Sequence, residues 1–96
     1  MIITTKSRLE ILISSLEELL KIPFVENAED YLAVMETRAV LFQCRETNGA
    51  NVGCLMAAMN EIIMIASFAG YKYDDRIFIA ELAIDEMRSA MCHASS

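Results

Sequence analysis

The acidic side chains within the helical segments have the clearest capacity for chemistry in this chain. Glu61 interrupts an otherwise apolar run, and Glu81 and Asp85 stand one helical turn apart. A carboxylate buried among apolar side chains has to be paired, protonated or bound to a metal ion. Some all-helical nucleotide pyrophosphohydrolases hold Mg²⁺ with such carboxylates. A Mg²⁺-dependent enzyme of this kind, with Glu61, Glu81 and Asp85 as ligands, is therefore one hypothesis for the chain.

The spacing of these acids weakens the metal hypothesis. No Glu-x-x-Glu or Glu-x-x-Asp pair lies inside the second or third helical segment. Glu26 and Glu29 have that spacing, but they flank the start of the second segment and are better explained as charges that suit a helix N-terminus. Asn60 and Glu61 are more simply a solvent-facing strip on the third segment. We therefore expect no metal and no cofactor.

The possible nucleophiles and bases also lack the surroundings that catalysis needs. Cys44, Cys54 and Cys92 are odd in number and show neither a Cys-x-x-Cys nor a zinc-binding spacing, which indicates reduced thiols. Cys54 lies in a first helical turn, where the helix dipole lowers a thiol pKa, but its apolar surroundings favour an inert core residue. His93 lies on a tail that we expect to fray, so it cannot be held beside a nucleophile. We expect no catalytic residue.

Charge and motifs exclude further classes of function. The net charge is −6, and no cluster of lysine and arginine is present, so binding to nucleic acid is disfavoured. There is no Gly-x-Gly-x-x-Gly sequence, no Walker loop and no His-Glu-x-x-His sequence. With only three glycines, a phosphate-binding loop is difficult to build.

Apolar residues recur at helical spacing in four segments, approximately 6–22, 28–47, 51–69 and 75–92. Pro23 ends the first segment, and Asn27 is a suitable N-cap for the second. Asn48-Gly49 and Gly70 are stop signals, and Asp74 or Asp75 caps the last segment. The second segment carries an apolar stripe of Ala28, Leu32, Met35, Ala39 and Phe42, widened by Tyr31, Val34 and Leu41.

These elements predict an all-α fold. Four helices joined by short loops form antiparallel neighbours, and no segment alternates with a period of two. We expect residues 1–96 to form a single domain. Its architecture would be a four-helix up-and-down bundle or a pair of helical hairpins, and dimerisation could complete it.

The third segment is apolar on nearly all sides, and its length raises the question of a membrane span. Asn60 and Glu61 lie in its middle, where a charge is costly in lipid. We therefore interpret it as the buried centre of a bundle. Residues 1–8 lack an uninterrupted apolar stretch and Glu10 interrupts the apolar residues after them, so we expect no signal peptide and a cytoplasmic location.

Hydrophobic residues make up 55% of the chain, more than is typical, and this surplus favours an apolar surface reserved for another chain. We expect a non-enzymatic protein-protein interaction module, such as an adaptor, an inhibitor or a chaperone-like protein. Its partner would be a second copy or a different protein. In composition alone, the chain resembles secretion chaperones, phage-encoded inhibitors and small adaptors.

The expected contact surface is an exposed side of the third or fourth helix, with acidic residues of the second helix as a charged rim. The candidate partner-binding residues are Met56, Met59, Ile63, Met64, Phe68, Phe78, Met87 and Met91. Methionine repacks easily, which suits an adaptable interface, although it suits ordinary core packing as well. The sequence does not separate these two uses.

Overall fold

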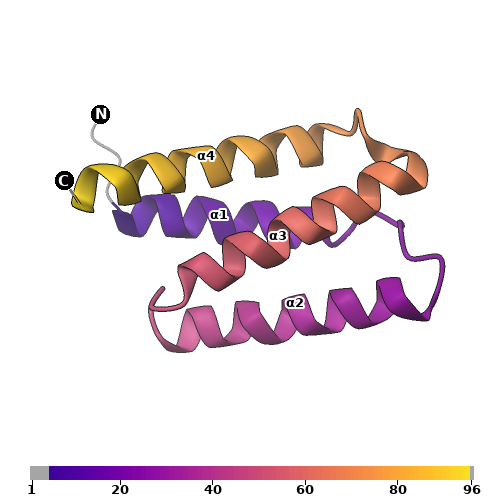
Figure 1. The fold of residues 1–96 in the computed structure, drawn as a ribbon, viewed down its shortest axis with the longest axis horizontal. Helices are drawn as coiled ribbons and strands as arrows, with labels where there is room; N and C mark the ends of the chain where they lie inside the picture. Colours follow the sequence, from indigo (N-terminus) through magenta and orange to yellow (C-terminus); the bar gives the residue numbers. More distant parts are fainter. Residues whose placement is uncertain (1–4, 96) are drawn as a thin grey trace.

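The computed structural model describes the backbone of residues 5–95 and the side chains of residues 7–92. Its helices are α1 (Thr5–Leu19), α2 (Ala28–Glu46), α3 (Val52–Ala66), the π-helical turn η1 (Ser67–Tyr71) and α4 (Asp75–Ser95), and the described residues contain no strand. Successive α-helices run in opposite directions (Figure 1). The predicted all-α, up-and-down arrangement is confirmed. Residues 1–4 of the N-terminal segment, in which no signal peptide is expected, lie outside the described residues, as does the His93 side chain.

The first helix ends earlier than the sequence predicts. It was expected to reach residue 22, but α1 ends at Leu19 and residues 20–22 form a turn. The N–H groups of Lys21 and Ile22 donate to carbonyls only three residues back, at 3.1 and 3.2 Å. Pro23 forces Ile22 out of the α region, and the last turn tightens before the chain leaves the helix.

The start of α2 is fixed by its cap. The Asn27 side chain accepts a hydrogen bond of 2.9 Å from the N–H of Asp30. The Asp30 carboxylate in turn accepts one of 3.1 Å from the N–H of Glu26. The first bond satisfies a backbone N–H that the helix itself leaves unpaired, and the second ties the residue before the cap to the first turn. The predicted N-cap is therefore confirmed.

The loop from α2 to α3 turns on two residues in the left-handed region. Asn48 has a φ of 55° and Gly49 a φ of 92°. Gly49 also lies against α1, since a Cβ atom on it would stand 2.8 Å from Leu9 Cδ2. Glycine fits here because it tolerates positive φ and brings the backbone close to a neighbouring side chain. The predicted stop after the second helix is confirmed.

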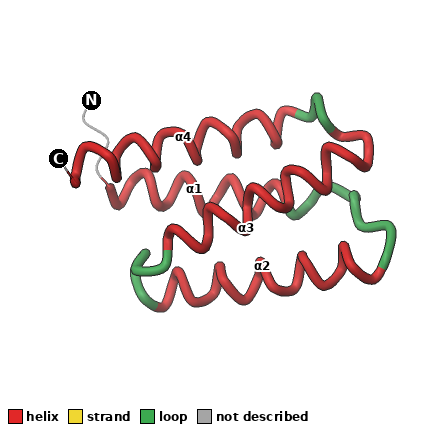
Figure 2. Tube along the Cα trace, viewed as in Figure 1, coloured by secondary structure: helices red, strands yellow, loops and turns green. Residues whose placement is uncertain are grey.

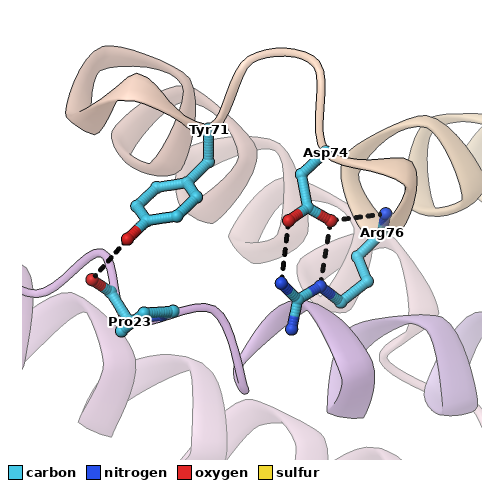
Figure 3. Close-up of polar contacts among 4 residues, drawn as sticks. All are labelled: Pro23, Tyr71, Asp74 and Arg76. Carbon is cyan, nitrogen blue, oxygen red and sulfur yellow. Dashed lines mark hydrogen bonds and ion pairs between the residues drawn. The ribbon is translucent and has the colours of Figure 1, made fainter.

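The connection from α3 to α4 is held by two polar contacts (Figure 3). α3 continues into η1, and Gly70, at φ 105°, ends the helical run. The Tyr71 hydroxyl donates to the Pro23 carbonyl at 3.3 Å, which ties this connection to the α1–α2 loop. Asp74 accepts two side-chain bonds from Arg76, of 2.9 and 2.7 Å, and one of 2.9 Å from the Arg76 backbone N–H. Asp74 therefore caps the N-terminus of α4, which begins at Asp75.

The helices pack as two pairs. α1 lies along α4 and α2 lies along α3, while α3 also contacts α1 and α4 and so joins the pairs. The extents of 41 × 27 × 20 Å describe a flattened arrangement with α2 at its edge (Figure 2). Among the described residues, the largest fully buried side chains are Leu12, Leu16, Leu19, Phe24, Cys44, Leu55, Met59, Ile62, Ile77 and Met87. Phe24 comes from the α1–α2 loop, which the sequence pattern marks only as a linker.

α3 is central but exposes one side, which includes the predicted solvent-facing strip of Asn60 and Glu61. Leu55, Met59 and Ile62 lie in the core, whereas Asn60 and Glu61 are exposed on the opposite face. By length and composition alone, Val52–Tyr71 qualifies as a membrane-spanning helix among the described residues, which is weak evidence because core helices meet the same criterion. The last helix also differs from expectation, since α4 continues through residue 93 to Ser95.

Candidate interaction surface

The predicted partner-binding residues divide between the core and the surface. Met56, Met59 and Met87 are buried against neighbouring helices, and Ile63 is partly buried. These four side chains therefore serve packing in this conformation. Met64, Phe68, Phe78 and Met91 are exposed. The exposed members come from two helices and the turn between them, and not from a single helical face.

Three aromatic side chains project near the α3–α4 connection. Phe68 is 87% exposed, Tyr73 91% and Phe78 63%. Phe68 belongs to η1, Tyr73 to the following turn and Phe78 to the first turn of α4. Large aromatic side chains are costly to leave in water and are enriched at protein interfaces. We refer to Phe68, Tyr73 and Phe78 as the aromatic end.

Two shallow hollows with acidic residues in their walls adjoin members of the aromatic end, one at Phe68 and one at Tyr73 and Phe78. The first, of about 250 Å³, is lined by Glu26, Asn27, Asp30, Ile65, Phe68 and Ala69. The second, of about 230 Å³, is lined by Lys72, Tyr73, Asp74, Asp75, Phe78 and Glu81. The first hollow brings the N-terminus of α2 beside Phe68. Asp30 of α2 and Glu26 of the loop before it therefore lie close to Phe68.

Asp74, in the wall of the second hollow, remains charged at neutral pH. The side-chain hydrogen bonds from Arg76, followed by the bond from its backbone N–H, lower the pKa of Asp74 to about 2. The same pairing raises the pKa of Arg76. Asp74 therefore has a structural partner, and its charge is partly balanced within the turn.

A second apolar surface runs along the outer face of α2. Leu32 is 58% exposed, Met35 46% and Phe42 63%. With Ala28 and Ala39, which are also exposed, they form the α2 stripe. The sequence pattern identifies these five residues as a stripe, but it does not show which way the stripe faces. None of them was among the predicted partner-binding residues.

The signal for this second surface was the breadth of the apolar pattern on α2. The residues that pack inward are Ala33, Val34, Thr37, Leu41 and Cys44. They lie on the opposite side of the helix from the α2 stripe. α2 therefore has two apolar faces, whereas a surface helix normally has one. The presence of a second apolar face on α2 could have indicated an interface. Periodicity alone, however, does not distinguish the outer face from the inner one.

The carboxylates of the metal hypothesis lie in open positions. Glu61 is exposed on α3, and Glu81 and Asp85 are exposed on α4. Because Glu61 is in contact with solvent, burial no longer requires it to bind a metal ion. Among the described residues, no group of three or more histidine, cysteine, aspartate or glutamate side chains is arranged to hold a metal. The hydrolase hypothesis stays a prediction without a structural argument behind it.

The cysteines occupy different environments. Cys44 is buried, and burial raises the pKa of its thiol, an effect that the charge of Arg45 partly opposes. Cys54 is exposed in the first turn of α3, so the expectation that it is a core residue is wrong. The inward face of α3 begins one residue later, at Leu55, and a single position rotates a side chain by about 100° around a helix.

Comparison with protein-family models, with curated proteins and with solved structures gives no match to this chain. The function therefore has to be argued from the two exposed apolar surfaces.

Proposed function

We propose that this chain is a small non-enzymatic interaction module, of the adaptor, inhibitor or chaperone-like kind, that binds a partner protein through the aromatic end. The observation that supports the proposal is the exposure of Phe68, Tyr73 and Phe78 together near one helix connection. Exposed aromatic anchors of this kind supply most of the binding energy in many interfaces. A cytoplasmic location fits the reduced thiols expected from the sequence.

The charge around the aromatic end defines the chemistry of the partner. Glu26 and Asp30 border Phe68, and Asp75 and Glu81 border Phe78. A complementary partner presents apolar side chains flanked by lysine or arginine, because opposite charges at the rim speed association and exclude acidic competitors. We therefore expect binding to weaken as the salt concentration rises.

The test is affinity purification from the cells that produce the chain, followed by titration of the purified partner. The bait is the full chain, compared with a Phe68→Asp/Phe78→Asp variant and with an Ile11→Asp variant as a matched control at an exposed apolar position of α1. We expect a partner that is retained by the wild type and the control but lost by the aromatic-end variant. The proposal fails if the same proteins bind all three baits equally.

A further inference from the structure

The α2 stripe has the spacing of a helix-pairing seam. Its residues follow one another at intervals of four, three, four and three, from Ala28 to Phe42. This alternation places side chains at the two inward positions of a heptad, the pattern by which two helices pair along their length. The inner face of α2 already packs on α3. The stripe is therefore a second seam on the same helix, exposed in the part of the chain that the structure describes.

Charged residues flank the stripe in two rows of opposite sign. Glu29 and Glu36 follow directly after stripe residues and lie on one side. Arg38 and Arg45 lie on the other side, where Arg45 also pairs with Glu17 of α1 at 2.8 Å. All four side chains are exposed. α2 therefore presents an apolar seam with an acidic flank and a basic flank.

The two flanks distinguish the possible arrangements of a pair of α2 helices. If two copies pair in the same direction about a two-fold axis, the acidic flank of each copy meets the basic flank of the other. If they pair in opposite directions, acid meets acid and base meets base. Like charges side by side oppose association. The flanks are complementary to a second copy only in the parallel arrangement.

We propose that the α2 stripe is the interface of a parallel homodimer. The stripe points away from α3, and α2 lies at the edge of the molecule, so a second copy approaches without meeting the other helices (Figure 1). The N-terminus of α2 adjoins Phe68. A parallel pair therefore carries both aromatic ends at the same end of the dimer. This last consequence rests on the proposed function, whereas the interface itself does not.

The exposed apolar area of the α2 stripe determines how tightly two copies of the chain can bind each other. About half of each large stripe side chain is exposed, as is half of the neighbouring Tyr31. Together, Leu32, Met35, Phe42 and Tyr31 offer apolar area on the order of 400 Å² per copy. A stable interface typically buries about 800 Å² per partner, so the flanking side chains have to contribute the remainder. We therefore expect dissociation in the micromolar range.

The experiment is absolute mass by light scattering and sedimentation equilibrium on the full chain, over about 5 to 500 µM. We expect the mass to rise toward twice the 10.8 kDa of one chain. Met35→Glu should weaken dimerisation about thirtyfold or more, because it places a charge in the seam. Leu82→Glu, at an exposed apolar position of α4, is the matched control and should leave the dimer unchanged. A wild type that stays monomeric, or a Met35→Glu variant that dimerises normally, overturns the proposal.

Orientation is tested with a cysteine at the start of the seam. Ala28→Cys is introduced in a Cys54→Ser/Cys92→Ser background, which leaves the buried Cys44 as the only other thiol. In a parallel dimer, position 28 of one copy lies beside position 28 of the other, and mild oxidation should yield a covalent dimer. In an antiparallel dimer, these positions are at opposite ends. A dimer that does not cross-link overturns the parallel arrangement.

A reversal of charges on the two flanks tests the parallel dimer even if the Met35→Glu variant does not fold. Arg38→Glu removes a basic flank residue and should weaken the dimer about tenfold. In a parallel heptad pair, position 38 of one copy faces position 43 of the other, so adding Gln43→Arg places opposite charges across the seam and should recover most of the loss. Circular dichroism verifies that helicity is unchanged in each variant. A double variant as weak as the single one contradicts the proposal. Partner binding at the aromatic end is measured separately, so either proposal can fail alone.

Discussion

At the residue scale, short polar side chains determine where the chain turns. Asn27 caps α2 and Asp74 caps α4, each by accepting a hydrogen bond from a backbone N–H in the first turn. Asp74 does more than a neutral cap, since its carboxylate also binds the Arg76 guanidinium through both oxygens. This turn also presents the adjacent Tyr73, so the cap supports the aromatic end.

Asp74 should make the stability of the protein dependent on pH in the acid range. Its pKa falls from the ordinary 3.8 to about 2 in the folded state. The stabilisation is therefore complete above pH 3.8 and is lost as the pH falls through about 2, because the carboxyl group is then protonated in the folded and the unfolded chain alike. We expect Asp74→Ala to lower the melting temperature at pH 7. The difference from wild type should shrink towards pH 2.

The matched control is Asp74→Asn. Asparagine retains an acceptor for the Arg76 N–H but lacks the charge, so its melting temperature should lie between those of the wild type and Asp74→Ala. If the wild type and Asp74→Ala differ equally at pH 2 and pH 7, the carboxylate charge does not hold this turn.

At the element scale, one residue type serves two purposes on the same helix. Met59 and Met64 both belong to α3, yet Met59 is fully buried and Met64 is 58% exposed. A step of five positions along a helix turns the side chain by about 140°, which carries it from the inner face to the outer one. The same division exists on α2, where Leu41 packs inward and Leu32 faces outward.

Alanine substitutions should separate these two environments. Met59→Ala removes a core side chain and leaves a cavity, so it should lower the free energy of unfolding by about 2–5 kcal/mol. Met64→Ala should change it by less than about 0.5 kcal/mol. Urea unfolding monitored by circular dichroism measures both variants. Equal losses would show that the two faces of α3 are assigned incorrectly.

At the scale of the whole molecule, α3 holds two helix pairs together. α2 is the edge helix, fastened by its inner face to α3 and by the Arg45–Glu17 ion pair to α1. An exposed ion pair contributes little, on the order of 0.5 kcal/mol. The attachment of α2 therefore depends on its apolar inner face, where Cys44 is fully buried.

The rate at which the Cys44 thiol is labelled should report how often α2 separates from α3. In a Cys54→Ser/Cys92→Ser variant, Cys44 is the only thiol. Burial shields it and raises its pKa, which lowers the reactive thiolate fraction. We expect Cys44 to react at least about a hundredfold more slowly than Cys54 in the Cys44→Ser/Cys92→Ser variant, and to accelerate with urea. Equal labelling rates would contradict a closed α2–α3 interface.

The helices were predictable from local sequence signals. Asn27, Asn48-Gly49 and Asp74 act through their own backbone neighbourhood, so their effect does not depend on the rest of the fold. Two of the helix ends that differ from expectation, at Leu19 and at the passage from α3 into η1, lie where the chain adapts to the next element. Of the candidate site, Phe68 and Phe78 are exposed and stay candidates for partner binding, whereas Met59 and Met87 are buried in the core.

The sequence by itself determined the helices, their order and the excess of apolar residues over what one core needs. It did so because helical periodicity and capping are encoded within a few residues. Only the tertiary structure decided which apolar faces pack inward. α2 carries two such faces, and the choice between Leu41 and Leu32 depends on where α3 lies. Burial is a property of neighbours distant in sequence, so the outer stripe of α2 became visible only once the helices were placed together.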